Sequence, residues 1–264
     1  MNIIIRELKA NRKALIIWSV CIILFIVMGM AKFEGFSAMG EEADKLLSVY
    51  PEAIQKAFGL GTMKLTEIKG YYSIFYMYFV LIAGIHAAML GANIISKESR
   101  DKTADFLMVK PVTRKHIITS KIIAALINII IINLAIGITS IIYINKYNTG
   151  EPFTNTMIII MITLFINQCI FLSMGLALSA ITKSSKKASS LSTGIIVIMY
   201  MLSIARDISE KVDFVKYVTP FSYFNVKEII RNNSVELLYV FLSLLIIIVC
   251  IIITYTKNQR KDIV

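Results

Sequence analysis

The chain has 264 residues, of which 57% are hydrophobic, and its mean hydropathy is +0.73. No soluble core of this size needs so much apolar sequence, so the composition indicates an integral membrane protein. The net charge of +11 is also typical of nucleic-acid-binding proteins. However, the Lys and Arg residues lie in segments that flank apolar runs, which favours a membrane-topology signal over nucleic acid as a partner.

The first 13 residues interleave basic and apolar side chains, the pattern of an amphipathic helix that lies on membrane lipid. The uncharged run 14–31 follows and is long enough to span a bilayer. A cleavable signal peptide is the alternative, because Gly29-Met30-Ala31 ends in small residues. The run is nevertheless longer than the usual signal-peptide apolar region of about 7–15 residues, so we expect a retained span.

Five more apolar runs follow, so the predicted fold class is an all-α integral membrane protein with six transmembrane helices in a single domain, 1–264. The expected spans are 14–31, 71–95, 122–144, 157–181, 188–205 and 237–256. The fifth run is short, which predicts a shortened or tilted span. Between the first two spans, the outer loop 32–70 contains two stretches with helical spacing, 41–47 and 51–58.

The distribution of charge predicts the orientation of the chain. The N-terminus, the central loop 96–121, the loop around Lys183 and the C-terminal tail together hold 17 basic and five acidic residues, a net charge of +12. The three other connections hold 11 basic and 12 acidic residues, a net charge of −1. By the positive-inside rule, both termini and the central loop are expected in the cytoplasm, with the protein in the cytoplasmic membrane.

The central loop 96–121 carries the most informative pattern. Pro111 has no N–H group and disfavours α conformation at the residue before it, so a helix over 101–109 should end there. Thr113 is placed to cap the next helix through its hydroxyl group. Ala104, Leu107 and Met108 form an apolar stripe suited to docking a partner. An ordinary basic loop that only fixes topology is the alternative.

Residues 98–114 combine an acidic residue, a Lys-Thr pair, an apolar pair, a proline and an arginine in one membrane-flanked loop. This combination resembles the loop between the second and third spans of ABC-2-type permeases, the membrane subunits of ABC transporters. The resemblance implies a coupling helix seated in a groove of the ATP-binding subunit, and an elbow helix over 1–13. The residues that carry it are Glu98, Lys102, Thr103, Asp105, Phe106, Leu107, Pro111, Val112 and Arg114.

A second likeness lies in the outer loop 206–236, where the segment Thr219-Pro220-Phe221 is flanked by aromatic residues. It looks like the loop before the last span of the same permeases, where short re-entrant helices dip towards the bilayer. Together the two likenesses imply a permease subunit that moves substrate across or out of the membrane, export being the usual direction. They also imply a second permease subunit, identical or paralogous, and two separate ATP-binding subunits.

The chain has no ATP-binding motif, so we expect it to be no enzyme and to hold no cofactor of its own, ATP and Mg²⁺ being bound by the partner. A membrane scaffold or sensor subunit that recruits a cytoplasmic partner through the central loop is the alternative. An ion-coupled carrier is disfavoured, because no apolar run has an Asp, Glu, Lys or Arg near its middle.

Several polar residues do fall at membrane depth. They either line a translocation path or make hydrogen bonds between helices, and the sequence leaves both roles open. The residues are His86, Asn128, Asn133, Asn167 and Gln168. The three cysteines are far apart in apolar runs and only two histidines are present, so no metal site is expected.

Overall fold

The structure is a computed structural model, and it describes residues 3–40, 42, 45, 48–58, 60, 63–100, 113–148, 150, 152–182 and 184–260. Over these residues the secondary structure consists of helices and no strands, and six helices are long and apolar enough to cross a membrane. The predicted fold class is therefore confirmed. The long helices are α1 (Ile3–Ala31), α5 (Ile68–Arg100), α7 (Arg114–Tyr147), α8 (Thr154–Ile181), α9 (Ser185–Ile208) and α11 (Leu237–Arg260).

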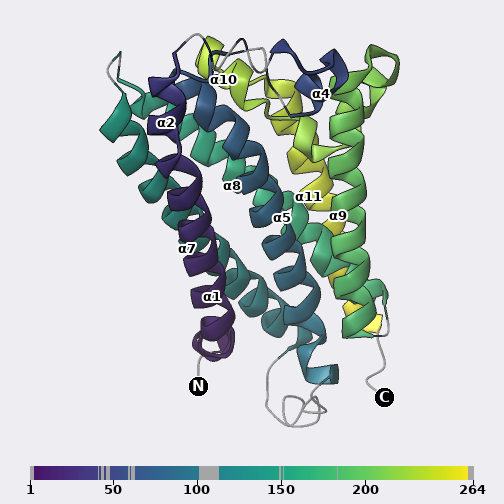
Figure 1. Ribbon diagram of the computed structural model, residues 1–264. Coiled ribbons are helices and arrows are strands. Elements are labelled where there is room, and N and C mark those ends of the chain that lie inside the picture. The colour runs from purple at the N-terminus through teal and green to yellow at the C-terminus, as the bar shows by residue number, and fades with distance from the viewer. Residues whose placement is uncertain are drawn as a thin grey trace.

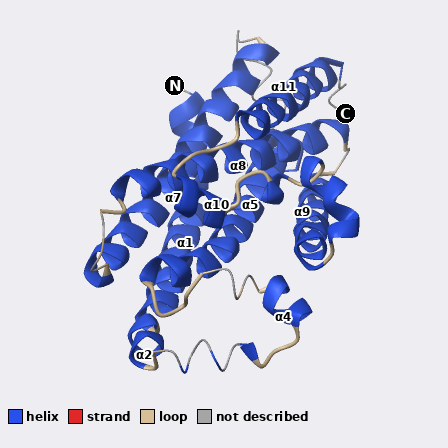
Figure 2. Cartoon of the chain, turned by 90° about the horizontal axis from the view of Figure 1, so that it is seen from above, coloured by secondary structure: helices blue, strands red, loops and turns tan. Residues whose placement is uncertain are grey.

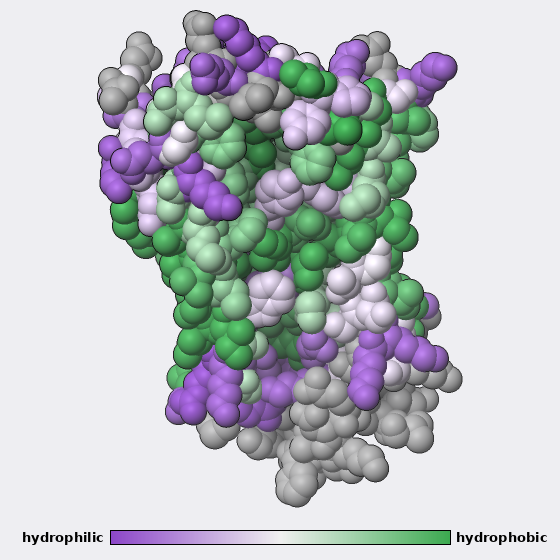
Figure 3. All heavy atoms as spheres, in the orientation of Figure 1, coloured by the Kyte–Doolittle hydropathy of each residue, from purple (hydrophilic) through white to green (hydrophobic). Residues whose placement is uncertain are grey.

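The long helices pack side by side, with both chain ends at one end of the bundle (Figure 1). We call this the terminal end and the opposite one the distal end. The distal end carries the short helices α2 (Phe33–Ala38), α4 (Glu52–Ala57) and α10 (Val226–Asn232), and the 3-10 helices η1 (Glu210–Tyr217) and η2 (Pro220–Ser222) follow α9. On the face shown in Figure 3, apolar residues cover most of the middle of the molecule and hydrophilic residues gather towards both ends, as expected of a membrane-spanning protein.

Helices α5 and α8 form the centre of the bundle. They lie between α1 and α7 on one side and α9 on the other (Figure 2). About half of the residues in the apolar part of each are buried, against 11% in the apolar part of α11. Their backbones come close where Gly91 and Gly175 meet. A Cβ atom on Gly91 would collide with the carbonyl oxygen of Leu172, and one on Gly175 with that of Ala88. Only glycine permits this approach.

The structure differs from the expected elements in two places. Helix α1 runs from Ile3 to Ala31 without interruption, so a separate elbow helix over 1–13 is not confirmed. The physical reason is that no proline and no glycine occurs between residues 3 and 28, so nothing breaks the helix where the basic segment meets the apolar run. Helix α9 covers Ser185–Ile208, longer at both ends than the apolar run 188–205.

The connections agree only in part with the expectations. The stretch 51–58 forms α4, with Pro51 as its N-cap residue, whereas α2 was not expected from the sequence. The predicted helix 41–47 lies mostly outside the described residues, and the predicted helix 101–109 lies entirely outside them. The predicted cap is confirmed, because the Thr113 hydroxyl oxygen accepts a hydrogen bond from the backbone N–H of His116 at 3.3 Å.

Candidate functional site

A cavity of about 60 Å³ lies at the distal end, and we call it the distal cavity. Five parts of the chain surround it: α5, α8, α9, η2 and the start of α10. Aromatic rings form much of its wall, and Asn167 reaches it from α8. The aromatic residues are Tyr76, Tyr200, Phe221 and Phe224. Asn167 and the Thr219-Pro220-Phe221 segment stood out in the sequence for separate reasons, and in the structure Asn167 and Phe221 both line this cavity.

Hydrogen bonds to α9 hold the segment η2 and the residue before it in place beside the cavity. The Thr219 hydroxyl donates to the carbonyl oxygen of Met199 at 3.0 Å, and the Ser222 hydroxyl lies 3.3 Å from that of Ser203. The ring of Phe221 packs against Tyr200, with the ring centroids 5.4 Å apart. Pro220 at the first position of η2 fixes its φ angle and starts the turn.

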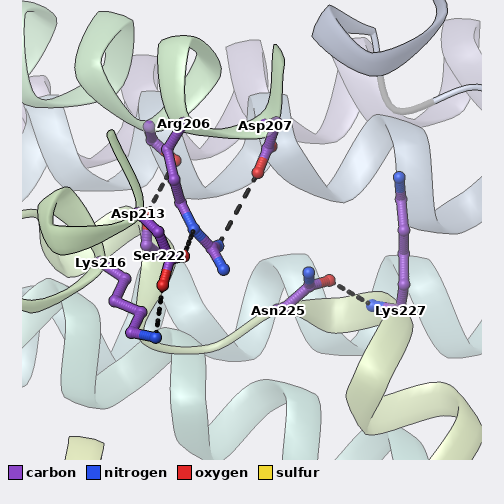
Figure 4. Close-up of polar contacts among 8 residues, drawn as sticks. Arg206, Asp207, Asp213, Lys216, Ser222, Asn225 and Lys227 are labelled. Atoms are coloured by element: carbon purple, nitrogen blue, oxygen red, sulfur yellow. Dashed lines mark hydrogen bonds and ion pairs between the residues drawn. The ribbon is translucent and has the colours of Figure 1, made fainter. Parts of the chain in front are cut away.

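Charged residues gather beside the cavity (Figure 4). Arg206, near the end of α9, places Nε 3.2 Å from Asp213 Oδ1 and Nη1 3.8 Å from Asp207 Oδ1. Lys216 Nζ lies 2.6 Å from the other Asp213 oxygen. Lys216 and Arg206 together hold the pKa of the Asp213 carboxyl below its usual value. This ionic cluster ties η1 to α9.

Lys227 of α10 also lines the cavity. The first turn of α10 is capped by the Asn225 side chain, which accepts a hydrogen bond from the Lys227 backbone N–H at 3.0 Å. Burial lowers the pKa of the Lys227 ammonium group, an effect that the nearby Asp207 carboxylate partly opposes. Of the charged residues that line the cavity, two are basic, Arg206 and Lys227, and one is acidic, Asp207. The lining therefore has a net charge of +1.

The terminal end holds a second group of polar contacts, around the helix ends that precede and follow residues 101–112. Lys121 of α7 is 2% exposed, and its Nζ donates to the carbonyl oxygen of Ile94 in α5 at 2.6 Å. Glu7 of α1 is fully buried, and its Oε2 lies 3.7 Å from Lys97 Nζ in α5. The ends of α5 and α7 are thus joined to each other, and α5 is joined to α1.

The polar residues at membrane depth divide into two groups. Asn133 and Gln168 contact each other, because Asn133 Nδ2 donates to Gln168 Oε1 at 3.2 Å and joins α7 to α8. Asn128 Nδ2 donates within its own helix, to the carbonyl oxygen of Ala124 at 2.7 Å. These three residues have structural partners, while the role of any of them in a translocation path stays a prediction.

His86 and Asn167 each have a buried atom without a hydrogen-bond partner among the described residues, as does Gln168 at its Nε2. His86 is 4% exposed and packs edge-on against Trp18, with ring centroids 5.4 Å apart. Within the described part of the chain, neither His86 Nδ1 nor Asn167 Oδ1 has a hydrogen-bond partner. Of these two unmatched buried atoms, only that of Asn167 belongs to a residue that lines the distal cavity. Among the described residues, no group of His, Cys, Asp and Glu could hold a metal ion.

The family model described as "ABC-2 family transporter protein" matches residues 1–263 of the chain. The chain belongs to the ABC-2 transporter family. As a member it is a multi-pass permease subunit of the ABC-transporter kind, a class that is generally not itself an ATPase and generally works with an ATP-binding cassette partner. A search of curated proteins finds no match.

In this ABC-2 family protein, most residues of the predicted coupling pattern lie outside the described residues, so their contact with an ATPase stays a prediction. They are Lys102, Thr103, Asp105, Phe106, Leu107, Pro111 and Val112. The two flanking members are placed: Glu98 belongs to the last turn of α5, and Arg114 is the first residue of α7.

Sequence reasoning missed four charged residues of this ABC-2 family protein as site residues: Glu7, Lys121, Arg206 and Lys227. In the sequence they are charged residues outside the apolar runs, and such residues usually face water or lipid headgroups. The one available signal was that two of them adjoin a predicted span: Lys121 directly precedes the apolar run 122–144, and Arg206 directly follows the run 188–205. The contacts of Lys121 with Ile94 and of Glu7 with Lys97 join residues far apart in the chain, whereas Arg206 pairs with the nearby Asp207 and Asp213.

Proposed function

We propose that this chain is the permease subunit of an ABC exporter, acting as a dimer of permeases over two ATP-binding subunits that bind ATP and Mg²⁺. The observation that carries the proposal is the family match over residues 1–263. The six long helices and the position of the central loop, between α5 and α7 at the terminal end, support it.

The contacts at the terminal end suggest how movement of the partner reaches the membrane. Closure of the ATP-binding subunits would push on residues 101–109, with Glu98 and Arg114 on either side. Because Lys121 holds α7 to the backbone of α5 at Ile94, a displacement of the loop moves both helix ends together. Helix α7 continues for 34 residues and α5 packs tightly on α8, so both carry the displacement towards the distal end.

The orientation follows from the charge distribution: both termini and the central loop are cytoplasmic, and the distal cavity opens towards the outside. A labelling experiment tests this point. In a chain whose three native cysteines are replaced, a membrane-impermeant maleimide should label Glu52→Cys in α4 on intact cells, and should label Lys257→Cys in α11 only after permeabilisation. The reverse pattern would overturn the orientation.

The partner is tested by co-purification from native membranes in mild detergent. We compare the wild-type chain with the central-loop double variant Glu98→Arg plus Leu107→Asp. The matched control makes the same chemical changes at the distal end, Glu52→Arg plus Ile54→Asp in α4, where both side chains are exposed. The wild type and the control should bring down an ATPase with nucleotide-binding motifs, and the central-loop variant should not.

Two other outcomes decide against the proposal. If none of the three chains brings down an ATPase, and the wild type instead retains a different cytoplasmic protein through the central loop, the scaffold or sensor alternative is supported. If the central-loop variant retains the ATPase as well as the control does, contact between the two subunits does not depend on Glu98 and Leu107. The coupling-helix assignment would then be wrong.

A further inference from the structure

We propose that the distal cavity binds the anionic phosphate group of an amphiphilic molecule from the outer part of the membrane. The proposal goes beyond the permease function, because the binding needs neither the ATPase nor transport. It rests on the position of the cavity, on the charge of its lining and on one buried polar atom without a partner.

The position suits an amphiphile. Arg206 and Asp207 line the cavity and lie in the last turn of α9, which ends at Ile208. The end of α9 lies at the distal end of the bundle, so this part of the cavity lies where the apolar span ends (Figure 1). Phosphate groups of amphiphiles lie at this depth of a bilayer. A cavity of about 60 Å³ has room for such a group and not for a whole lipid, so the apolar part must lie outside it.

The charge of the lining favours an anion. Asp207 and Asp213 fix the Arg206 guanidinium through two ion pairs (Figure 4), and Ser222 and Asn225 also line the cavity. A fixed guanidinium suits phosphate oxygens because its N–H groups form a planar fork. Lys227 adds a second positive charge, and an anion beside this partly buried ammonium group would offset the cost of its desolvation.

The buried amide of Asn167 points to a ligand that also donates a hydrogen bond. The side chain is 4% exposed, lines the cavity, and its Oδ1 has no hydrogen-bond partner among the described residues. An unmatched buried acceptor is costly, so it is a place where a donor is favourable. A hydroxyl group attached to the phosphate, as in a glycerol headgroup, would supply that donor.

The test uses the purified full-length chain in a neutral detergent and measures its thermal unfolding midpoint against ligand concentration. The probes are short-chain phosphatidylglycerol, short-chain phosphatidylcholine and inorganic phosphate. We expect phosphatidylglycerol to stabilise the chain, and its apparent Kd to rise about tenfold in Lys227→Gln, as expected for the loss of one charged hydrogen bond. Asp207→Asn raises the lining charge to +2 and leaves the shorter contact of Arg206, with Asp213 at 3.2 Å, in place, so it should tighten binding.

Lys216→Gln is the matched control, because it removes the same charge at the same end from a residue that does not line the cavity. It should leave the affinity unchanged. Equal weakening by Lys216→Gln and Lys227→Gln would mean general charge attraction and overturn the site. If Lys227→Gln does not fold, Asp207→Asn still decides, because weaker or unchanged binding in that variant overturns the proposal.

The probes distinguish the source of the phosphate. Stabilisation by phosphatidylglycerol alone supports an amphiphile. Equal stabilisation by inorganic phosphate, with the same response to the variants, would identify a free anion as the ligand and overturn the amphiphile. Equal stabilisation by phosphatidylcholine and phosphatidylglycerol would show that the site does not select a net negative charge, and would overturn the anionic ligand. Because no ATPase is present in this experiment, each of these failures leaves the permease proposal untouched.

Discussion

The two halves of the α5 and α8 pair differ, although the same two helices form both. Both helices run from the distal end to the terminal end (Figure 1). In the terminal half, Gly91 and Gly175 let the backbones touch, with no room for a methyl group. In the distal half, Tyr76 and Asn167 line a cavity that η2 covers.

The closed region has glycine at the contact between the two helices, and the open region has larger side chains there. Small residues at four-residue spacing bring helices together and exclude any ligand. Aromatic and amide side chains keep helices apart, and the space between them must be closed by other elements. The closed half is therefore suited to transmitting movement and the open half to binding, and four predictions test this division.

The largest effect is expected in the closed half. In Gly175→Leu, the new side chain would collide with backbone atoms of Ala88 and Ala92, which cannot move without separating the helices. We expect a loss of about 3 kcal/mol or more of stability, seen as loss of the monodisperse peak in size-exclusion chromatography. The control is Gly194→Ala in α9, since no described atom lies within 4 Å of a Cβ built there. A folded Gly175→Leu protein would show that the contact between α5 and α8 can open.

The second effect concerns the end of the closed half. Lys121→Met keeps the aliphatic part of the side chain but leaves the carbonyl oxygen of Ile94 without this donor. We expect a loss of about 2 kcal/mol in a detergent-unfolding titration, and a lower ATPase response in the complex with the partner subunit. Lys115→Met, at an exposed position of the same helix, is the control. Equal behaviour of the two variants would mean that Lys121 does not join the helices.

The sequence predicted the bundle well because membrane spans are set by local composition. Long apolar runs such as 122–144 and 157–181 must form helices in a bilayer, where backbone groups have no water to bond. The limits of the helices were harder to predict. Arg206 and Asp207 looked like loop residues, but they continue α9 because Asp213, from the following 3-10 helix, pairs with Arg206.

The site was predictable only in fragments. Asn167 and the Thr219-Pro220-Phe221 segment were noticed for separate reasons, and no local pattern indicated that Asn167 and Phe221 line one cavity. Likewise, Gly175 was visible as a small residue, but its partner Ala88 lies 87 positions earlier in the chain. Contacts between distant segments depend on how the helices are arranged, and that arrangement is not encoded in any single run.

The third prediction places an effect of opposite sign in the open half. Asn167→Leu removes a buried acceptor that has no partner among the described residues, so we expect a gain of about 1 kcal/mol together with weaker stabilisation by phosphatidylglycerol. Asn133→Leu is the matched control, because Asn133 bonds to Gln168 and to the carbonyl oxygen of Met161, and its loss should destabilise. Unfolding titrations compare the two. Destabilisation by both variants would mean that Asn167 has a structural partner in solution.

The smallest effect concerns the ionic cluster that closes the open half. Because Lys216 and Arg206 lower the pKa of Asp213, the stabilising contribution of this carboxylate is present above the usual Asp pKa and is lost as the pH falls through the lowered value. Amide hydrogen exchange of residues 210–217 should therefore be slower in the wild type than in Asp213→Asn at neutral pH, with the difference vanishing in acid. Comparing both proteins at each pH removes the intrinsic pH dependence of exchange. A difference that persists below the lowered pKa would assign the protection of η1 to its packing on α9, and the charges would then contribute only to the polarity of the cavity mouth.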